Sequence, residues 1–222
     1  MRNSLINPSV RDVLGRLFAA AEEGDDAELA RITASHGADV QRTLSAAEKA
    51  QAFGALYIPV SPECGRLLYS LVRTARPETV VEFGTSFGIS TVYLAAAVAD
   101  NGSGKVISAE LNSAKAATAA ANLAQAGLAG VAEIVTGDAR ETLAEVPGPI
   151  GFVLLDGWKE SYLEVLRILE PRLAPGAMVV ADDTGSFAHM LGDYLGYVRD
   201  EANGYVSVAF PVGDGVEVSC RA

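Results

Sequence analysis

The sequence predicts an α/β protein: a Rossmann-like, doubly wound and mostly parallel sheet, with an antiparallel C-terminal hairpin and a helical N-terminal extension. Three observations support this prediction. From Arg76 onward, short runs rich in Val, Ile and Leu alternate with Ala-rich helical segments. The first run enters a glycine-bearing turn that leads into a helix, and near the C-terminus two strand-like runs flank "VGDG". Alternating strands and helices are typical of βαβ units and a parallel sheet, and "VGDG" is a hairpin turn signal.

The N-terminal third has a different pattern. Residues 8–75 carry apolar side chains at helical spacing, as in "VRDVLGRLFAAAEE" and "CGRLLYSLVRTA". The acidic "EEGDDAE" near residue 25 indicates a solvated junction between helices. We expect an extension over residues 1–55, followed by one domain over residues 56–222.

The elements of the second part follow in order along the chain. The expected strands are "TVVEF", "KVISAE", "AEIVTG", "GFVLLD" and "AMVVAD". Helices are expected at about 88–99, 113–126 and 161–173. The two strands of the hairpin lie in "YVSVAFPVGDGVEVSCR", which ends the fold.

Composition excludes several classes of protein. The net charge of −11 disfavours nucleic acid and anionic membrane surfaces as partners. The sequence shows neither an apolar run of bilayer-spanning length nor the pattern of a signal peptide, so we expect a cytoplasmic protein. Cys64 and Cys220 are isolated, which argues against a disulfide scaffold or a zinc site.

The turn "VVEFGTSFGIST" is the first chemical signal. Ligands of parallel α/β sheets bind beyond the carboxyl ends of the strands, and Gly84 and Gly88 would allow close backbone approach. The turn lacks the G-x-G-x-x-G of dinucleotide sites, and Glu82 would repel a pyrophosphate but attract a cationic ligand. "GTSFG" also matches a hydrolase elbow with Ser86 as nucleophile, and His189 follows in suitable order, so a serine hydrolase remains an alternative.

Acidic residues also end the next two strands. Glu110 can accept hydrogen bonds from both hydroxyls of a ribose, and Asp138 can accept from an adenine amino group. Together with Glu82, these acids indicate S-adenosylmethionine, whose sulfonium and amino groups are cationic. A noncatalytic nucleotide-binding module is a further alternative.

The chain at this point resembles class I S-adenosylmethionine-dependent methyltransferases, and among them the cation-dependent catechol and caffeoyl-CoA O-methyltransferases. The likeness rests on the D-x-x-K-x-x-Y pattern of Asp156, Lys159 and Tyr162, on "YIPVSPECGRLLYSL" before the first strand, and on the C-terminal "PVGDGVEVSCR". It implies a small aromatic acceptor, a homodimer, and an N-terminal extension that acts as a lid or a dimer contact. It also implies a set of cofactor-binding residues: Val60, Glu82, Gly84, Ser86, Gly88, Ser90, Glu110, Asp138, Ala139, Asp156 and Trp158.

Carboxylates at the ends of the fourth and fifth strands predict a metal site. If these strands are neighbours, Asp156, Asp182 and Asp183 converge, and hard oxygen ligands suit Mg²⁺, Mn²⁺ or Ca²⁺. A divalent cation would stabilise a phenolate at neutral pH. Lys159, partly desolvated beside it, could lose its proton and act as general base, with Trp158 as an apolar wall.

Two positions depart from the family pattern. Gly157 replaces a bulkier residue, which would enlarge the acceptor pocket, and Asp183 stands where the family generally has Asn. A metal-independent methyltransferase acting on another small acceptor is therefore an alternative, as is a Lys159 that only pairs with Glu160 or Glu164 at the surface. No basic patch for a CoA pyrophosphate is evident, which favours free catechol-like acceptors.

Overall fold

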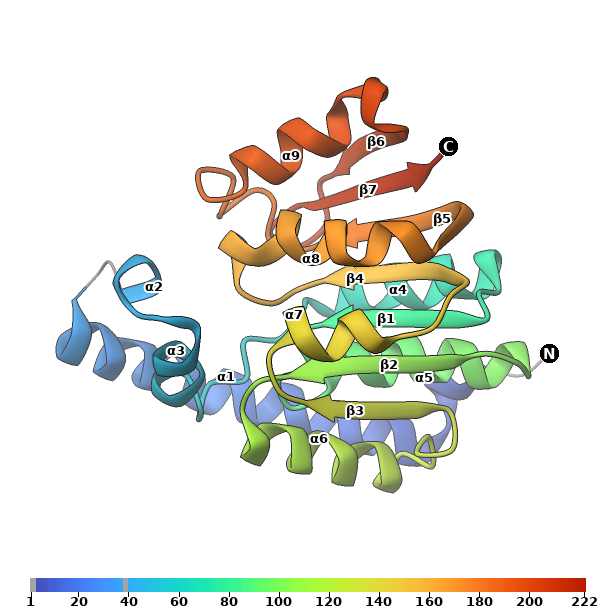
Figure 1. The fold of residues 1–222 in the computed structure, drawn as a ribbon. Helices are drawn as coiled ribbons and strands as arrows, with labels where there is room; N and C mark the ends of the chain where they lie inside the picture. The colour runs from blue at the N-terminus through green and yellow to red at the C-terminus, as the bar shows by residue number, and fades with distance from the viewer. Residues whose placement is uncertain (1–2, 38–39) are drawn as a thin grey trace.

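The computed structural model describes residues 3–37 and 40–222 and contains one seven-stranded sheet in the order β3-β2-β1-β4-β5-β7-β6. Figure 1 shows helices on both faces of this sheet. The strands are β1 (Thr79–Phe83), β2 (Lys105–Glu110), β3 (Ala132–Thr136), β4 (Ile150–Leu155), β5 (Leu173–Ala181), β6 (Tyr205–Phe210) and β7 (Val216–Arg221). β1 to β5 pair in parallel, whereas β7 pairs antiparallel with both β5 and β6. The predicted α/β class and the C-terminal hairpin are confirmed.

The α-helices and 3₁₀-helices connect these strands. The α-helices are α1 (Pro8–His36), α2 (Val40–Thr43), α3 (Ala46–Ala52), α4 (Pro62–Ala75), α5 (Ile89–Asn101), α6 (Ser113–Gln125), α7 (Ala139–Thr142), α8 (Tyr162–Leu169) and α9 (Gly192–Arg199). The 3₁₀-helices are η1 (Ser4–Ile6), η2 (Leu143–Glu145), η3 (Lys159–Ser161), η4 (Glu170–Arg172) and η5 (Glu201–Asn203). Among the helices in the described ranges, none has both the length and the apolar character needed to cross a bilayer.

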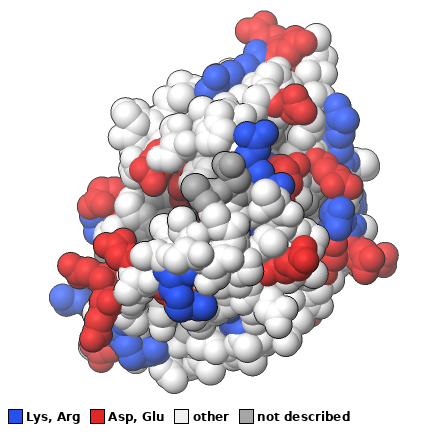
Figure 2. Space-filling model, turned by 90° about the vertical axis from the view of Figure 1, so that its left-hand side faces the viewer, with Lys and Arg blue, Asp and Glu red and all other residues white. Residues whose placement is uncertain are grey.

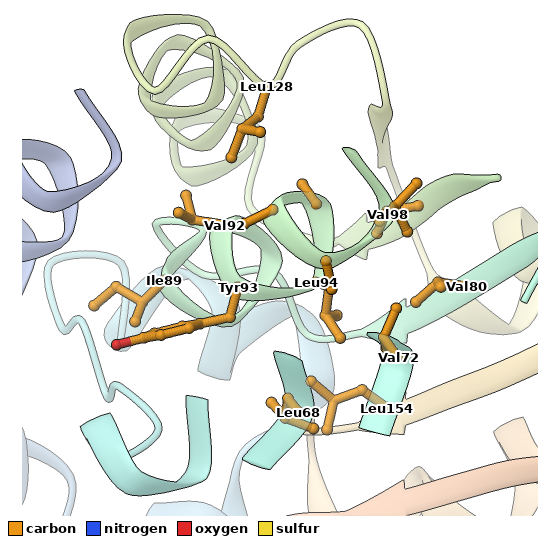
Figure 3. Close-up of a cluster of buried hydrophobic side chains, with 14 of the residues drawn as sticks. Leu68, Val72, Val80, Ile89, Val92, Tyr93, Leu94, Val98, Leu128 and Leu154 are labelled. Atoms are coloured by element: carbon orange, nitrogen blue, oxygen red, sulfur yellow. The ribbon is translucent and has the colours of Figure 1, made fainter. Parts of the chain in front are cut away.

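The two faces of the sheet bury separate cores because successive side chains of a strand point to opposite sides. Val80 belongs to the core that includes apolar residues of α1, α4, α5 and α6, and the neighbouring Val81 belongs to the core that includes residues of α7, α8 and α9. Figure 3 shows the first core, in which Leu68 and Val72 of α4 and Leu94 of α5 meet Val80 and Leu154 of the sheet. These cores fix the carboxyl ends of the parallel strands at one edge of the sheet.

The largest differences from the expected elements lie in α1, β5 and α8. "EEGDDAE" lies inside the continuous helix α1, because its acids are solvated on a helix whose apolar positions continue on both sides. β5 begins at Leu173, earlier than "AMVVAD" indicates. The helix expected over residues 161–173 ends at Leu169 and passes into η4, which contains Pro171.

The N-terminal helices do not form a separate layer. α1 runs beside α5 and α6, and the segment after it returns across the carboxyl ends of the strands (Figure 1). Asp25 of α1 accepts hydrogen bonds from the backbone N–H groups of Tyr57 and Ile58, at 2.9 and 2.8 Å. This contact fixes the chain just before α4. The domain boundary after residue 55 and the homodimer remain predictions.

Candidate active site at the carboxyl edge of the sheet

A cavity of about 510 Å³ lies where β1, β2 and β4 end. On the face viewed from this side, acidic and basic side chains are interspersed (Figure 2). Most of the predicted site residues line the cavity: Val60, Gly84, Ser86, Ser90, Glu110, Asp138, Ala139, Asp156, Trp158, Lys159 and Asp183. Glu82, Gly88 and Asp182 are not among the lining residues.

Glu110 is held with its carboxylate ready for further hydrogen bonds. Its Oε2 accepts from the backbone N–H of Ser86 at 2.7 Å, and its Oε1 accepts from the backbone N–H of Asn112 at 2.8 Å. Each oxygen keeps a lone pair. This arrangement suits two neighbouring hydroxyl donors, such as those of a ribose.

We expect Glu110→Ala to weaken binding of S-adenosylhomocysteine by roughly 1.5–3 kcal/mol, because charge-assisted hydrogen bonds to the ligand are lost. Isothermal titration calorimetry measures the change. Glu133→Ala, at an exposed carboxylate of β3, is the control and should bind normally. Equal affinity in the two variants would show that Glu110 does not hold the cofactor.

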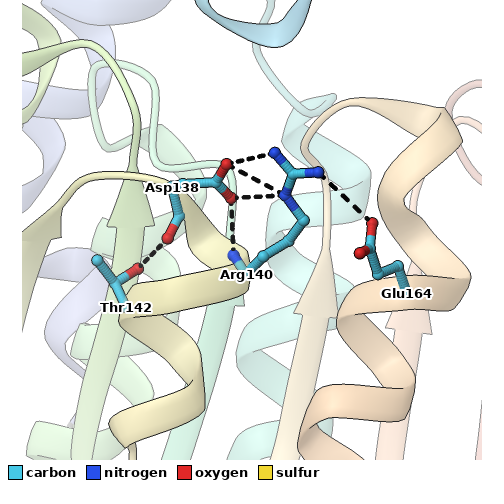
Figure 4. Close-up of polar contacts among 4 residues, drawn as sticks. All are labelled: Asp138, Arg140, Thr142 and Glu164. Carbon is cyan, nitrogen blue, oxygen red and sulfur yellow. Dashed lines mark hydrogen bonds and ion pairs between the residues drawn. The ribbon is translucent and has the colours of Figure 1, made fainter.

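Asp138 and Arg140 lie at the adjoining wall, where β3 leads into α7. Both oxygens of Asp138 accept hydrogen bonds from the Arg140 guanidinium, and Arg140 also approaches Glu164 of α8 at 3.8 Å (Figure 4). The hydrogen bonds from Arg140 lower the pKa of Asp138. An adenine amino group would therefore share this carboxylate with Arg140, a residue that the sequence analysis did not identify.

Glu82 lies beneath the site and faces α5. It occupies the same face of β1 as Val80, so its carboxylate is fully buried and accepts hydrogen bonds from the hydroxyls of Thr91 and Ser108. Its Oε1 has no hydrogen-bond partner. Burial raises the pKa of Glu82 to about 7, even though hydrogen bonds from Ser108, Ser90 and Thr91 lower it.

The raised pKa of Glu82 predicts a pH-dependent stability. The folded state holds this proton more tightly than a carboxyl with the ordinary pKa of 4.5, so the stabilisation is complete below that pH and is lost as pH rises through about 7. The difference between these two pKa values corresponds to about 3 kcal/mol of unfolding free energy. We expect Glu82→Gln to flatten the fall in unfolding free energy between roughly pH 5 and pH 8, as measured in urea. Glu133→Gln, at an exposed position, should keep the wild-type dependence of unfolding free energy on pH. The same dependence in Glu82→Gln would contradict the explanation by a buried acid.

Glycines in the turns after β1 and β4 allow these two turns to pack closely against each other. A Cβ on Gly84, which has a φ of +101°, would lie 2.5 Å from the backbone oxygen of Asp156, and one on Gly157 would lie 2.4 Å from the ring of Phe83. Gly157 lines the cavity, and a side chain there would displace the ring of Phe83; the enlarged acceptor pocket remains a prediction. Gly88 packs against Ala119 of α6 as the N-cap of α5.

Lys159 lies at the opposite end of the cavity from Glu110. Its side chain is largely buried, and its Nζ lies 2.8 Å from Asp183 Oδ2 and 3.6 Å from Asp156 Oδ1. It also donates a hydrogen bond of 2.7 Å to the hydroxyl of Tyr162. Lys159 is therefore a buried site residue, and the alternative of a surface pair with Glu160 or Glu164 is not what the geometry shows.

The three predicted metal ligands do not converge. Asp183 and Asp156 face Lys159, whereas Asp182 lies beside Cys64, with Sγ to Oδ1 at 3.7 Å. Across residues 3–37 and 40–222, no group of three or more His, Cys, Asp or Glu side chains is arranged to hold a metal ion. Asp156 and Asp183 instead share the Lys159 ammonium, which approaches both carboxylates. Asp183 has a φ of +64°, a conformation that Asp and Asn tolerate better than most residues.

The Lys159 ammonium does not balance the negative charge of Asp156, Asp182 and Asp183. Burial raises the pKa of Asp156 well above its ordinary value, and Asp182 and Asp183 raise it further, although Lys159 opposes them. Burial and then Asp183 raise the pKa of Asp182 to about 6. The donor atoms are hard oxygens, so the chemistry of the set fits a divalent cation, provided that Lys159 releases Asp183.

Lys115 is a second residue that the sequence analysis missed. Its buried ammonium donates hydrogen bonds to the backbone oxygen of Leu56, at 2.6 Å, and to the hydroxyl of Ser86, at 3.2 Å. Burial lowers the pKa of Lys115. Its signal in the sequence is weak: it is the single charged residue of the Ala-rich segment Ser113–Gln125.

His189 and Ser86 are not arranged as a hydrolase pair. The hydroxyl of Ser86 donates to the backbone oxygen of Tyr57 at 2.8 Å, and the ring of His189 stacks on that of Phe187, with 6.5 Å between the centroids. Trp158 lines the cavity and meets the ring of Phe53 edge-on, at 5.6 Å between centroids.

Comparison with known proteins gives matches over most of the chain. The family model described as "Methyltransferase domain" matches residues 81–184. A catechol O-methyltransferase of Niastella koreensis is 32% identical over 130 residues, which cover 57% of this chain and 58% of that protein, less than two thirds of its length. A catechol O-methyltransferase of Mycobacterium tuberculosis is 31% identical over 177 residues, covering 79% of this chain and 73% of that protein. The crystal structure of cofactor-bound Rv0187 from MTB has a TM-score of 0.68 and 26% identity, covering 89% of this chain and 91% of that one.

Proposed function

Since this chain belongs to the S-adenosylmethionine-dependent O-methyltransferases, in the family that includes the catechol O-methyltransferases, we propose that it methylates one hydroxyl of a small catechol-like aromatic. The observation that carries the proposal is a single cavity with Glu110 at one end and Lys159 at the other. Glu110 would hold the ribose of the cofactor, and Lys159 would meet the acceptor hydroxyl.

The reaction is a direct transfer between two bound molecules. The phenol oxygen attacks the sulfonium methyl carbon, the new C–O bond forms as the S–C bond breaks, and S-adenosylhomocysteine leaves. Lys159 is the proposed acceptor of the phenol proton, and Asp183 and Asp156 would hold the resulting ammonium. Most of the rate comes from holding the two reactants in line.

We also propose divalent-cation assistance. Oxygens of Asp156, Asp182 and Asp183 would hold the cation, which would stabilise the phenolate form of the acceptor. Support comes from the excess of carboxylate over ammonium at this end of the cavity and from the raised pKa values of Asp156 and Asp182.

The acceptor is proposed to be a free phenol rather than a CoA ester. Acidic side chains outnumber basic ones around the cavity and would repel a pyrophosphate; the acids are Glu110, Asp138, Asp156, Glu160, Glu164 and Asp183, and the bases are Lys115, Arg140 and Lys159. Incubation with methyl-labelled S-adenosylmethionine and a panel of catechols, aromatic monophenols and caffeoyl-CoA tests the proposal. Labelled product from catechols is expected; label transfer to none of them would overturn it.

A further inference from the structure

Residues 40–58, which we call the strap, touch both ends of the cavity. At the cofactor end, the backbone oxygens of Ala50, Leu56 and Tyr57 accept hydrogen bonds from Asn112, Lys115 and Ser86 respectively. At the other end, Phe53 packs on Trp158. Leu44, Ala46 and Ala50 contribute to the lining of the cavity itself. The strap thus spans the ribose-binding turn and the loop that carries Lys159.

Lys49 makes the charged contact between the strap and that loop. Its side chain is only 2% exposed, its ammonium pairs with the carboxylate of Glu160, and it lies 5.4 Å from the centroid of the Trp158 ring. Glu160 directly follows Lys159 in η3, and Trp158 directly precedes it. Lys49 therefore holds both neighbours of the proposed base.

The ion pair between Lys49 and Glu160 favours the closed position of the strap. A buried ammonium without a partner is strongly unfavourable, so closure requires Glu160 in its observed position. Lifting the strap would return both charges to water, and the Glu160 side chain is already 46% exposed. The cost of opening is thus shared between the ion pair and the apolar contacts of Phe53 with Trp158.

We propose that Lys49 is a positioning residue: by closing the strap on Glu160 and Trp158, it sets the position of Lys159 relative to the bound cofactor. The turnover part of this inference rests on the proposed function. The alternative is an ion pair that only stabilises the fold. The two differ in what Lys49→Met does to the loop and to kcat when the protein is fully folded.

Trp158 is the single tryptophan of the chain, so its fluorescence reports on this loop. We expect S-adenosylhomocysteine to reduce acrylamide quenching of Trp158 in the wild type and to do so much less in Lys49→Met. In Lys49→Met, kcat should fall roughly tenfold, since small misplacements of reacting groups are costly, while the Kd for S-adenosylhomocysteine stays within about twofold. Lys49→Arg, which keeps the charge, should retain most of the wild-type kcat and of the effect of S-adenosylhomocysteine on quenching. Glu160→Gln removes the half-exposed partner of the same ion pair and should behave like Lys49→Met.

Arg31→Met is the matched control, because it breaks the pair between Arg31 and Glu28 within α1, and it should behave as the wild type. Unchanged quenching and unchanged kcat in Lys49→Met and Glu160→Gln would overturn the proposal. A fall in melting temperature with normal kcat per folded molecule would overturn it as well. The fluorescence measurement needs no turnover, so it tests whether Lys49 holds the Trp158 loop even if no tested phenol is methylated.

Discussion

Replacement of Lys159 with methionine is expected to lower kcat about a hundredfold or more and to leave cofactor affinity near normal. The Lys159 ammonium lies between Asp183 and Asp156, and methionine removes the proton acceptor while keeping much of the side-chain volume. Glu110, which would hold the ribose, lies at the other end of the cavity. Steady-state kinetics with a catechol, together with calorimetry for S-adenosylhomocysteine, measures both quantities.

Lys159→Arg separates the two roles that a lysine can have here. Arginine keeps the positive charge opposite Asp183 but is not deprotonated in proteins, so it cannot accept the phenol proton. If Lys159 is the base, Lys159→Arg should be nearly as slow as Lys159→Met. Wild-type turnover in Lys159→Arg would instead assign the residue a purely electrostatic role.

Removal of divalent cations is expected to abolish methylation of a catechol, and Mg²⁺ or Mn²⁺ should restore it. Asp156→Ala should cost the most activity, since it removes a proposed metal ligand and a partner of Lys159 together. Asp183→Asn should stay active but need more metal for half-maximal rate, because the site loses one negative charge.

Thermal unfolding tests the cation independently of turnover. A ligand that binds only the folded state raises the melting temperature with occupancy, so Mg²⁺ should stabilise the wild type and stabilise Asp156→Ala much less. Lys159→Met should bind Mg²⁺ more tightly than the wild type, because Asp183 no longer has an ammonium partner. Full activity in excess EDTA with no thermal shift on adding metal would instead support the metal-independent alternative.

The elements could be predicted well where the sequence pattern repeats over the whole element. β1 and β2 have the expected bounds because their runs are short, β1 being followed by Gly84 and β2 ending in Glu110. α9 was not identified, since "GDYLGYVR" carries two glycines and little helical signal. Cavity-lining residues such as Glu110 and Asp138 were predictable because strand ends meet at one edge of a parallel sheet.

Side-chain direction was harder to predict than position. Glu82 stands one residue from the end of β1, so alternation turns it under α5 rather than toward the cavity. Asp182 and Asp183 are neighbours in sequence but face Cys64 and Lys159 respectively. Contacts of the strap with Asn112 and Lys115 join residues about 60 positions apart, as in Leu56 with Lys115, and leave no local sequence signal.

The interlocked turns after β1 and β4 have a consequence for directed evolution of this protein. A Cβ on Gly84 would meet the backbone of Asp156, so most substitutions at Gly84 should destabilise the fold, whereas substitutions at Gly157 should displace the ring of Phe83. Ser161, Glu164 and Phe187 line the same cavity from outside these two turns. Saturation of those three positions should therefore change the preferred acceptor while both turns stay intact.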